Sequence, residues 1–159
     1  MTNTLVGSIA RIPVPTVAPS TPITQIASTM ANRNIGAVIV TKDFEVLGIV
    51  TERDIIARLA VAKKDVTGLV AQDIMTTPVI TINYERTLQE ALKIMNQNRI
   101  RRLVVVKDGN IFGLVTERRL LLASFAGDVK KLQIGPFQPM HDRWLKHSSK
   151  GSSSSGLQG

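Results

Sequence analysis

The residues best suited to chemistry form one short motif that occurs twice in the chain, 65 positions apart. Gly48-Ile-Val-Thr-Glu-Arg-Asp54 returns as Gly113-Leu-Val-Thr-Glu-Arg-Arg119. An ionised Asp54 can accept hydrogen bonds from two hydroxyl groups, and Thr51 offers its own hydroxyl at the start of a predicted helix, where anions bind well. Arg119 accepts no hydrogen bond, so the second copy cannot do the same chemistry. The two copies therefore predict two unlike sites.

A purely structural role explains part of the same motif. Thr51 and Asp54 have the spacing of a capping box, in which two side chains satisfy free N–H groups at a helix start without any ligand. A ligand role is favoured because the second copy keeps Thr116 but lacks the acidic residue, and because a cap leaves the pair Arg101-Arg102 unexplained. Those arginines could still be only a solvated strand end, since basic side chains commonly protect such ends.

The repeat extends well beyond this motif. The same shift of 65 aligns further identical residues along the whole unit, including Pro13 with Pro78 and Val14 with Val79. A repeated unit leaves an apolar face that a second copy can cover. The two copies therefore predict one domain with two-fold-like symmetry.

Apolar periodicity predicts the order strand, helix, strand, strand, helix in each copy, preceded by a short helix. The fold class is therefore α/β. The long helix of the first copy begins at a Thr21 cap with Pro22 in its first turn. The predicted strands are 14–17, 37–41, 46–50, 79–82, 103–106 and 111–115, and the predicted helices are 5–10, 21–32, 51–60, 70–75, 88–98 and 120–125. These elements give a first repeat over residues 1–65, a second over 66–126 and a basic, flexible tail over 127–159.

The composition favours a soluble protein with anionic partners. The 159 residues are 43% hydrophobic, enough for a real core, and include no cysteine. The start lacks the basic and apolar stretches of a signal peptide, and no apolar run approaches membrane-spanning length. We therefore expect a cytoplasmic protein with no membrane partner. Its formal charge of +8 favours nucleotides, nucleic acid or an acidic protein as partners.

With these features the chain resembles a tandem pair of CBS domains, the cystathionine-β-synthase-type regulatory modules also called a Bateman module. The resemblance covers nearly all of residues 5–125. It rests on Asp73-Ile-Met-Thr-Thr-Pro78, on Asn98-Arg-Ile-Arg-Arg-Leu-Val-Val-Val106 and on the motif that ends at Asp54. It implies two β-α-β-β-α repeats packed by pseudo-two-fold symmetry through their sheets. It also implies a module that is not an enzyme and that binds an adenosine-containing ligand in a cleft between the repeats.

The resemblance further implies that each cleft takes its Thr-x-x-Asp motif from one copy and its purine wall from the other. In the first cleft, Asp54 would accept the ribose hydroxyls and Thr51 would lie at a helix start suited to anions. AMP, ADP or ATP is the expected regulatory ligand, with S-adenosylmethionine as an alternative and no obligatory cofactor. The purine would lie among Pro78, Val79, Ile100 and Val104, and phosphate groups would contact Arg101, Arg102 and Arg118.

The second cleft follows from the same symmetry but lacks the ribose acceptor. It would combine Thr116 and Arg119 with Pro13, Val14, Ile35, Gly36, Ala37 and Ile39. A hydrogen bond to a charged group contributes about 1.5–3 kcal/mol, so its loss should weaken binding roughly tenfold to a hundredfold. We therefore expect one occupied site per chain.

Two other functions remain open from the sequence. The first is nucleic-acid binding through the basic tail, although aromatic residues make up only 4% of the chain and offer few stacking platforms. The second is a structural adaptor. The amphipathic helices favour a homodimer, because a sheet covered on one side leaves apolar helix surface for a second copy. The charged tail residues are Lys130, Lys131, Arg143, Lys146 and Lys150; His141 and His147 lie there without a clustered carboxylate, so neither a metal site nor histidine catalysis is expected.

Overall fold

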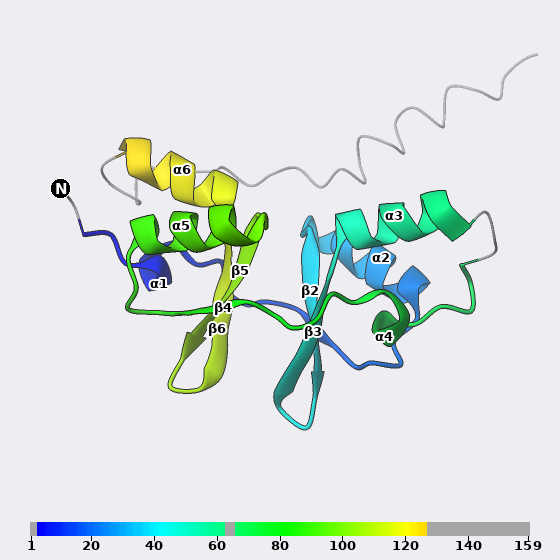
Figure 1. Ribbon diagram of the computed structural model, residues 1–159. Helices are drawn as coiled ribbons and strands as arrows, with labels where there is room; N and C mark the ends of the chain where they lie inside the picture. The colour runs from blue at the N-terminus through cyan, green and yellow to red at the C-terminus, as the bar shows by residue number, and fades with distance from the viewer. Residues whose placement is uncertain (1–2, 63–65, 127–159) are drawn as a thin grey trace, which may run out of the picture.

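The computed structural model describes residues 3–62 and 66–126, and it shows two halves built from the same elements in the same order (Figure 1). The α/β fold of two repeats predicted from the sequence is confirmed. The predicted tail lies outside the described residues. The first half contains α1 (Val6–Ile9), β1 (Thr16–Val17), α2 (Ile23–Arg33), β2 (Ala37–Lys42), β3 (Glu45–Thr51) and α3 (Glu52–Ala62). The second half contains α4 (Ala71–Ile74), β4 (Thr81–Asn83), α5 (Leu88–Asn98), β5 (Arg102–Lys107), β6 (Asn110–Thr116) and α6 (Glu117–Ala126).

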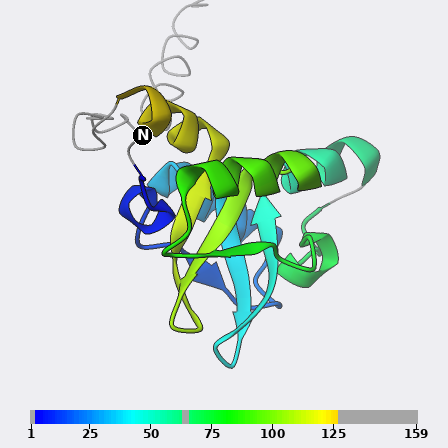
Figure 2. The ribbon, with the colours of Figure 1, turned by 60° about the vertical axis from the view of Figure 1, so that its left-hand side comes forward.

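Each half forms one three-stranded sheet. Strand β1 pairs with β2 in parallel and β2 pairs with β3 antiparallel, and β4, β5 and β6 repeat this order. Both hairpin turns place two consecutive residues at positive φ, Asp43 and Phe44 at 49° and 67°, and Asp108 and Gly109 at 50° and 78°. Such turns match the right-handed twist of the strands that they join. The two hairpins extend side by side from the helices (Figure 2).

Two local predictions need correction. Strands β1 and β4 begin at Thr16 and Thr81, not at Val14 and Val79. Val14 and Val79 are instead half-buried against the cluster between the sheets, and an apolar run does not locate the start of a strand. Thr21 does not cap α2: Pro22 occupies the N-cap position, and the Thr21 carbonyl accepts a hydrogen bond of 2.9 Å from Ala71 N–H.

The short helices that open each half belong to the core of the other half. Val6 and Ile9 of α1 are fully buried among residues of the second half, including Leu120. Ala71 and Ile74 of α4 are buried in the core of the first half. Figure 1 shows α1 beside α5 and α4 near α2 and α3. Each of these two hydrophobic cores therefore contains residues from both halves of the sequence.

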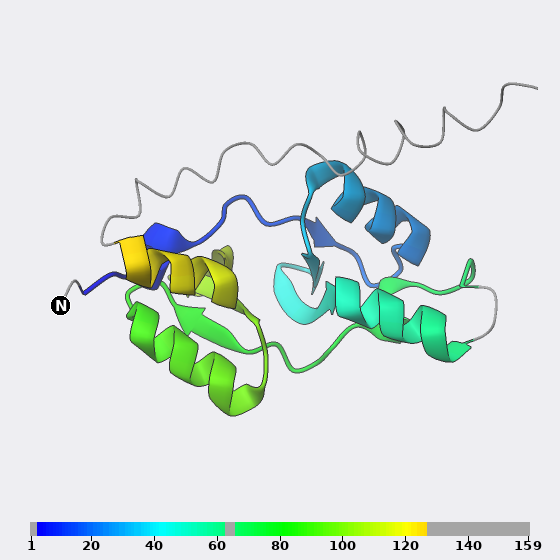
Figure 3. The same ribbon diagram turned by 90° about the horizontal axis from the view of Figure 1, so that it is seen from above.

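A third apolar cluster joins the two sheets. Ala37 and Ile39 of β2 are buried against Val104 of β5 and Leu114 of β6. Seen from above (Figure 3), α2 and α3 accompany one sheet while α5 and α6 accompany the other. The sheets therefore meet at the centre of the molecule, and residues at the strand ends lie beside the other half.

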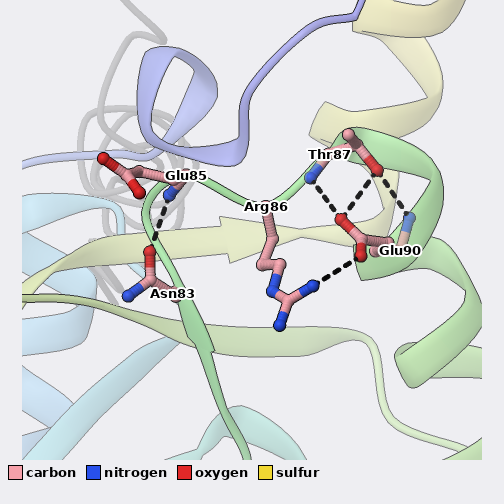
Figure 4. Close-up of polar contacts among 5 residues, drawn as sticks. All are labelled: Asn83, Glu85, Arg86, Thr87 and Glu90. Atoms are coloured by element: carbon pink, nitrogen blue, oxygen red, sulfur yellow. Dashed lines mark hydrogen bonds and ion pairs between the residues drawn. The ribbon is translucent and has the colours of Figure 1, made fainter.

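Helix α5 begins with a capping box, shown in Figure 4. The N–H and hydroxyl of Thr87 donate to Glu90 Oε2 at 2.8 and 3.0 Å, and the Glu90 N–H donates to Thr87 Oγ1 at 3.3 Å. Arg86 forms a 3.0 Å ion pair with Glu90 Oε1. The Thr87 backbone and side-chain hydrogen bonds, with a smaller contribution from Arg86, lower the pKa of the Glu90 carboxyl. This box stabilises a helix start without any ligand.

Candidate functional site

Asp54 lies in the first turn of α3, where the chain passes directly from β3 into the helix. Its Oδ2 accepts hydrogen bonds from the N–H and the hydroxyl of Thr51, both at 2.7 Å, and its own N–H donates to Thr51 Oγ1 at 3.3 Å. Thr87 and Glu90 make the same three contacts at the start of α5. Thr51 and Asp54 therefore form the capping box that the sequence offered as a role without a ligand.

The other carboxylate oxygen of Asp54 contacts the second half of the chain. Thr76 Oγ1 donates to Asp54 Oδ1 at 3.1 Å. Two backbone hydrogen bonds with Ile49, of 2.9 and 3.1 Å, hold Thr76 in this position. An ionised carboxylate has about four acceptor positions, of which three are used here. Asp54 can therefore accept one further hydroxyl, and a second if the Thr76 hydroxyl is displaced.

The residues predicted to surround a purine differ in how deeply they are buried. Pro78 and Val79 follow Thr76 closely, which places the exposed Pro78 and the half-buried Val79 near Asp54. Ile100 is half-buried against the core of the second half. Val104 is 1% exposed between the sheets, so its side chain can support the cleft only from behind.

Arg101 is the most exposed of the predicted phosphate ligands. Its side chain is 86% exposed, and its Nε lies 4.0 Å from Glu117 Oε2. An exposed ion pair at this distance holds the side chain only weakly. Arg101 is therefore free to turn toward a ligand.

A cavity of about 570 Å³ lies at the second cleft. It is lined by every residue that the resemblance implies for this cleft except Ile39, which is fully buried between the sheets. The predicted lining residues are Thr116, Arg119, Pro13, Val14, Ile35, Gly36 and Ala37, and the others are Arg11, Pro15, Arg33, Asn34, Arg102, Leu114, Arg118 and Leu122. Arg102 and Arg118, predicted for the first cleft, thus line the second.

The placement of Arg102 and Arg118 has a local cause. Arg102 Nη2 lies 3.8 Å from Glu52 Oε2, and a Cβ at Gly36 would come within 2.3 Å of the same nitrogen. Gly36 therefore leaves the space that the Arg102 side chain fills. Arg118 precedes Arg119 in the first turn of α6, so it lies at the same cleft.

Arg119 and Arg11 occupy the positions that Asp54 and Thr76 hold in the first cleft, as the shift of 65 predicts. The Arg119 Nε–H donates to the carbonyl of Ile9, and the Arg119 backbone N–H donates to Thr116 Oγ1 at 3.3 Å. Burial lowers the pKa of the Arg119 guanidinium, and the positive charge of Arg11 lowers it further. Two cations thus replace a carboxylate and a hydroxyl.

Arg11 and Arg33 line the second cleft but were not predicted from the sequence, because they lie outside the Thr-x-x-Asp motifs. The signal available for Arg11 was its alignment with Thr76 by the shift of 65.

Within residues 3–62 and 66–126, no group of three or more His, Cys, Asp or Glu residues could hold a metal ion, and no helix is both long and apolar enough to cross a membrane. The basic tail residues and both histidines lie outside this part of the chain.

Comparison with known proteins identifies the family. The family model for the CBS domain matches residues 6–61 and 70–126. The chain belongs to the CBS domain family. An uncharacterized protein of Methanopyrus kandleri is 35% identical to this CBS pair over 141 residues, which is 84% of this chain and 72% of that protein. Inosine-5′-monophosphate dehydrogenase of Thermoplasma acidophilum is 38% identical over 67% of this chain, but the match covers only 21% of that enzyme.

Solved structures of CBS proteins share the fold. A CBS-domain containing protein from Agrobacterium tumefaciens superposes with a TM-score of 0.71 and 29% identity, covering 77% of this chain and 100% of that one. The CBS domain pair of protein MJ0100 superposes with a TM-score of 0.69 and 27% identity, covering 79% of this chain and 98% of that one. That structure is a complex with 5′-methylthioadenosine and S-adenosyl-L-methionine.

Proposed function

We propose that this CBS pair is a non-catalytic regulatory module that binds an adenosine-containing ligand, such as AMP, ADP, ATP or S-adenosylmethionine, in the cleft at Asp54. The observation that carries the proposal is the 3.1 Å hydrogen bond between Thr76 Oγ1 and Asp54 Oδ1. It joins a carboxylate of one repeat to the segment that leads to Pro78 and Val79 in the other repeat. One ligand can therefore contact both repeats. The ligands of protein MJ0100, both of which contain adenosine, support this ligand class.

Each residue of the first cleft has a separate role in this proposal. Asp54 accepts the ribose hydroxyls, using its free position and the one that Thr76 now occupies. Thr51 keeps the carboxylate in place through its two 2.7 Å hydrogen bonds. Pro78, Val79 and Ile100 surround the purine, with Val104 behind them, and Arg101 turns toward any phosphate. Arg53, at the position equivalent to Arg118, can add a second positive charge there.

The regulatory effect follows from contact with both repeats. A ligand that binds the folded pair and not the unfolded chain stabilises it by about 2.7 kcal/mol at a concentration of 100 times the Kd. A ligand that replaces the Thr76–Asp54 hydrogen bond also favours one arrangement of the two repeats over others. Helix α3 begins next to this contact, so a partner bound to α3 can respond to the ligand.

The test is a calorimetric titration of the full chain with adenosine, AMP, ADP, ATP and S-adenosylmethionine. Adenosine and S-adenosylmethionine carry no phosphate, so they report the ribose and purine contacts alone. We expect at least one of these compounds to bind at one tight site per chain. Absence of binding by the whole panel would refute the proposal, and two equivalent sites for adenosine would refute the assignment to Asp54.

We also propose that the module is a homodimer formed through α3 and α6. Several apolar side chains on these two helices are exposed, among them Ile56 at 64%, Leu59 at 51% and Phe125 at 87%. Exposed apolar groups gathered on a few elements indicate a protein contact surface. A second copy offers the same two helices, as a symmetric dimer requires.

Mutations on α3 test the dimer. Replacing Ile56 and Leu59 together by lysine should shift the molar mass measured by light scattering from dimer to monomer. Phe44 provides a matched control, because it is apolar and fully exposed but lies in the β2–β3 turn. Phe44→Lys should leave the mass unchanged. A wild-type monomer at high concentration would contradict this proposal.

A further inference from the structure

The second cleft is lined by five arginines and by no aspartate or glutamate. Arg11 follows α1, Arg33 ends α2, Arg102 begins β5, and Arg118 and Arg119 lie in the first turn of α6. Segments that are far apart in the sequence thus bring positive charges to one cavity. Its volume of about 570 Å³ lies within the usual range for small-molecule sites, about 300–1,000 Å³.

Carboxylates neutralise little of this charge. Glu52 lies 3.8 Å from Arg102, a loose ion pair in which the Glu52 side chain is 61% exposed. The guanidinium groups of Arg33 and Arg118 form no hydrogen bond or ion pair within the described part of the chain. Glu117 is in the first turn of α6, but its nearest cation is Arg101, which does not line the cavity. Most of the positive charge therefore remains available to a ligand.

The other two arginines are held by neutral carbonyl groups. Arg11 donates to the carbonyls of Asn34 at 3.2 Å and Arg33 at 3.4 Å, and Arg119 donates to the carbonyl of Ile9. A guanidinium has five N–H donors, so about three remain on Arg11 and about four on Arg119. The carbonyls fix these groups in place without cancelling their charge. Such preorganised cations suit the oxygens of phosphate groups.

The residues that differ between the two clefts indicate what the second cleft binds. Asp54 can accept a hydroxyl but repels phosphate, whereas Arg119 at the equivalent position attracts phosphate and cannot accept a hydroxyl. Arg11 adds a second charge where the first cleft has Thr76. We infer that the second cleft binds an oligophosphate anion, either a free inorganic chain or the phosphate chain of a nucleotide, and recognises it by charge and not by its ribose. The inference concerns a different cleft from the proposed adenosine site and does not depend on it.

The experiment uses the full chain and inorganic tripolyphosphate, which has neither ribose nor base. Calorimetry should show one tight site per chain, with a Kd that rises as salt is added, because screening weakens charge–charge attraction. Asp54→Ala should leave this Kd within about twofold, since Asp54 lies outside the cavity lining. Absence of tripolyphosphate binding at low salt would overturn the inference.

The double variant Arg33→Gln/Arg118→Gln tests the cavity. Both guanidinium groups lack a partner within the described residues, so the variant should fold like the wild type, which its melting temperature checks. We expect its Kd for tripolyphosphate to rise at least tenfold. Lys42→Gln/Lys93→Gln is the matched control, because it removes two exposed positive charges outside the cavity. An equal loss of affinity in both variants would mean diffuse attraction to a basic protein and would overturn the inference.

Competition then identifies the source of the phosphate chain. Displacement of tripolyphosphate by ATP would support a nucleotide as the ligand, and failure of ATP to displace it would support a free inorganic chain. Adenosine should not displace it in either case. Displacement by adenosine would place both compounds in one cleft and would overturn recognition by charge alone.

Discussion

Asp54→Ala tests the proposed ribose contact at a residue that also caps α3 in this structure. The variant loses the acceptor proposed for the ribose, a hydrogen bond to a charged group that contributes about 1.5–3 kcal/mol. The Kd for adenosine or S-adenosylmethionine should therefore rise roughly tenfold to a hundredfold. The variant also loses the contacts to Thr51 and Thr76, which should cost about 1 kcal/mol of stability. For a domain of this size, that lowers the melting temperature by about 2–4 °C.

Glu90→Ala is the matched control for this experiment. Glu90 occupies in α5 the same position in a capping box that Asp54 occupies in α3, and it is among neither the residues that line the cavity nor those proposed for the first cleft. It should lower the melting temperature but leave the Kd within about twofold. Calorimetry gives the Kd, and a thermal melt without ligand gives the stability. Equal rises in Kd for the two variants would show that affinity follows stability, and an unchanged Kd in Asp54→Ala would refute the ribose assignment.

Three further predictions concern the fold. Ile9→Ala should lower the free energy of unfolding by about 2–5 kcal/mol, because Ile9 is fully buried. Amide hydrogen exchange should become faster in β5 and α5 before it does in β2, because α1 packs in the core of the second half. The opposite order would contradict this packing of α1. Because the folded state lowers the pKa of Glu90, its ionised form stabilises the fold fully above the unfolded pKa of about 4.3, and this contribution is lost as pH falls through the lowered value. The melting temperatures of wild type and Glu90→Gln should therefore converge in acid, and a constant difference down to pH 2 would refute this. Gly7→Ala should destabilise by about 1–3 kcal/mol in a thermal melt, because the added Cβ would lie 2.1 Å from the Tyr84 ring, and an unchanged melting temperature would show that the ring moves freely.

The elements of the fold could be predicted because each has a periodic signal of its own. Met30 and Met95 recur at helical spacing and are buried as expected, and Asp108-Gly109 marks a hairpin turn. The packing of α1 in the core of the second half could not be predicted. Val6 and Ile9 show only that one face of a short helix is buried, and either core offers an apolar surface to cover it.

The resemblance to CBS pairs, applied to the repeat, indicated part of the candidate site. It implies that Thr116 and Arg119 share a cleft with Pro13 and Gly36, and all four line the cavity. The direction of a long side chain was not predictable. Arg102 begins a strand at the junction of the repeats, and the space above Gly36, which depends on the folded backbone, determines the cleft that it lines.

The exchange of the opening helices also has a consequence for the order of synthesis. Val6 and Ile9 leave the ribosome among the first residues, but Leu120, which packs in the same core, leaves more than a hundred residues later. At about 5–20 residues per second, these two apolar side chains wait roughly 5 to 25 seconds for their core. The first sheet likewise lacks Ala71 and Ile74 until the second half has begun to emerge. Neither half made alone would contain its complete core, so we expect stable folding to require that both halves have been synthesised.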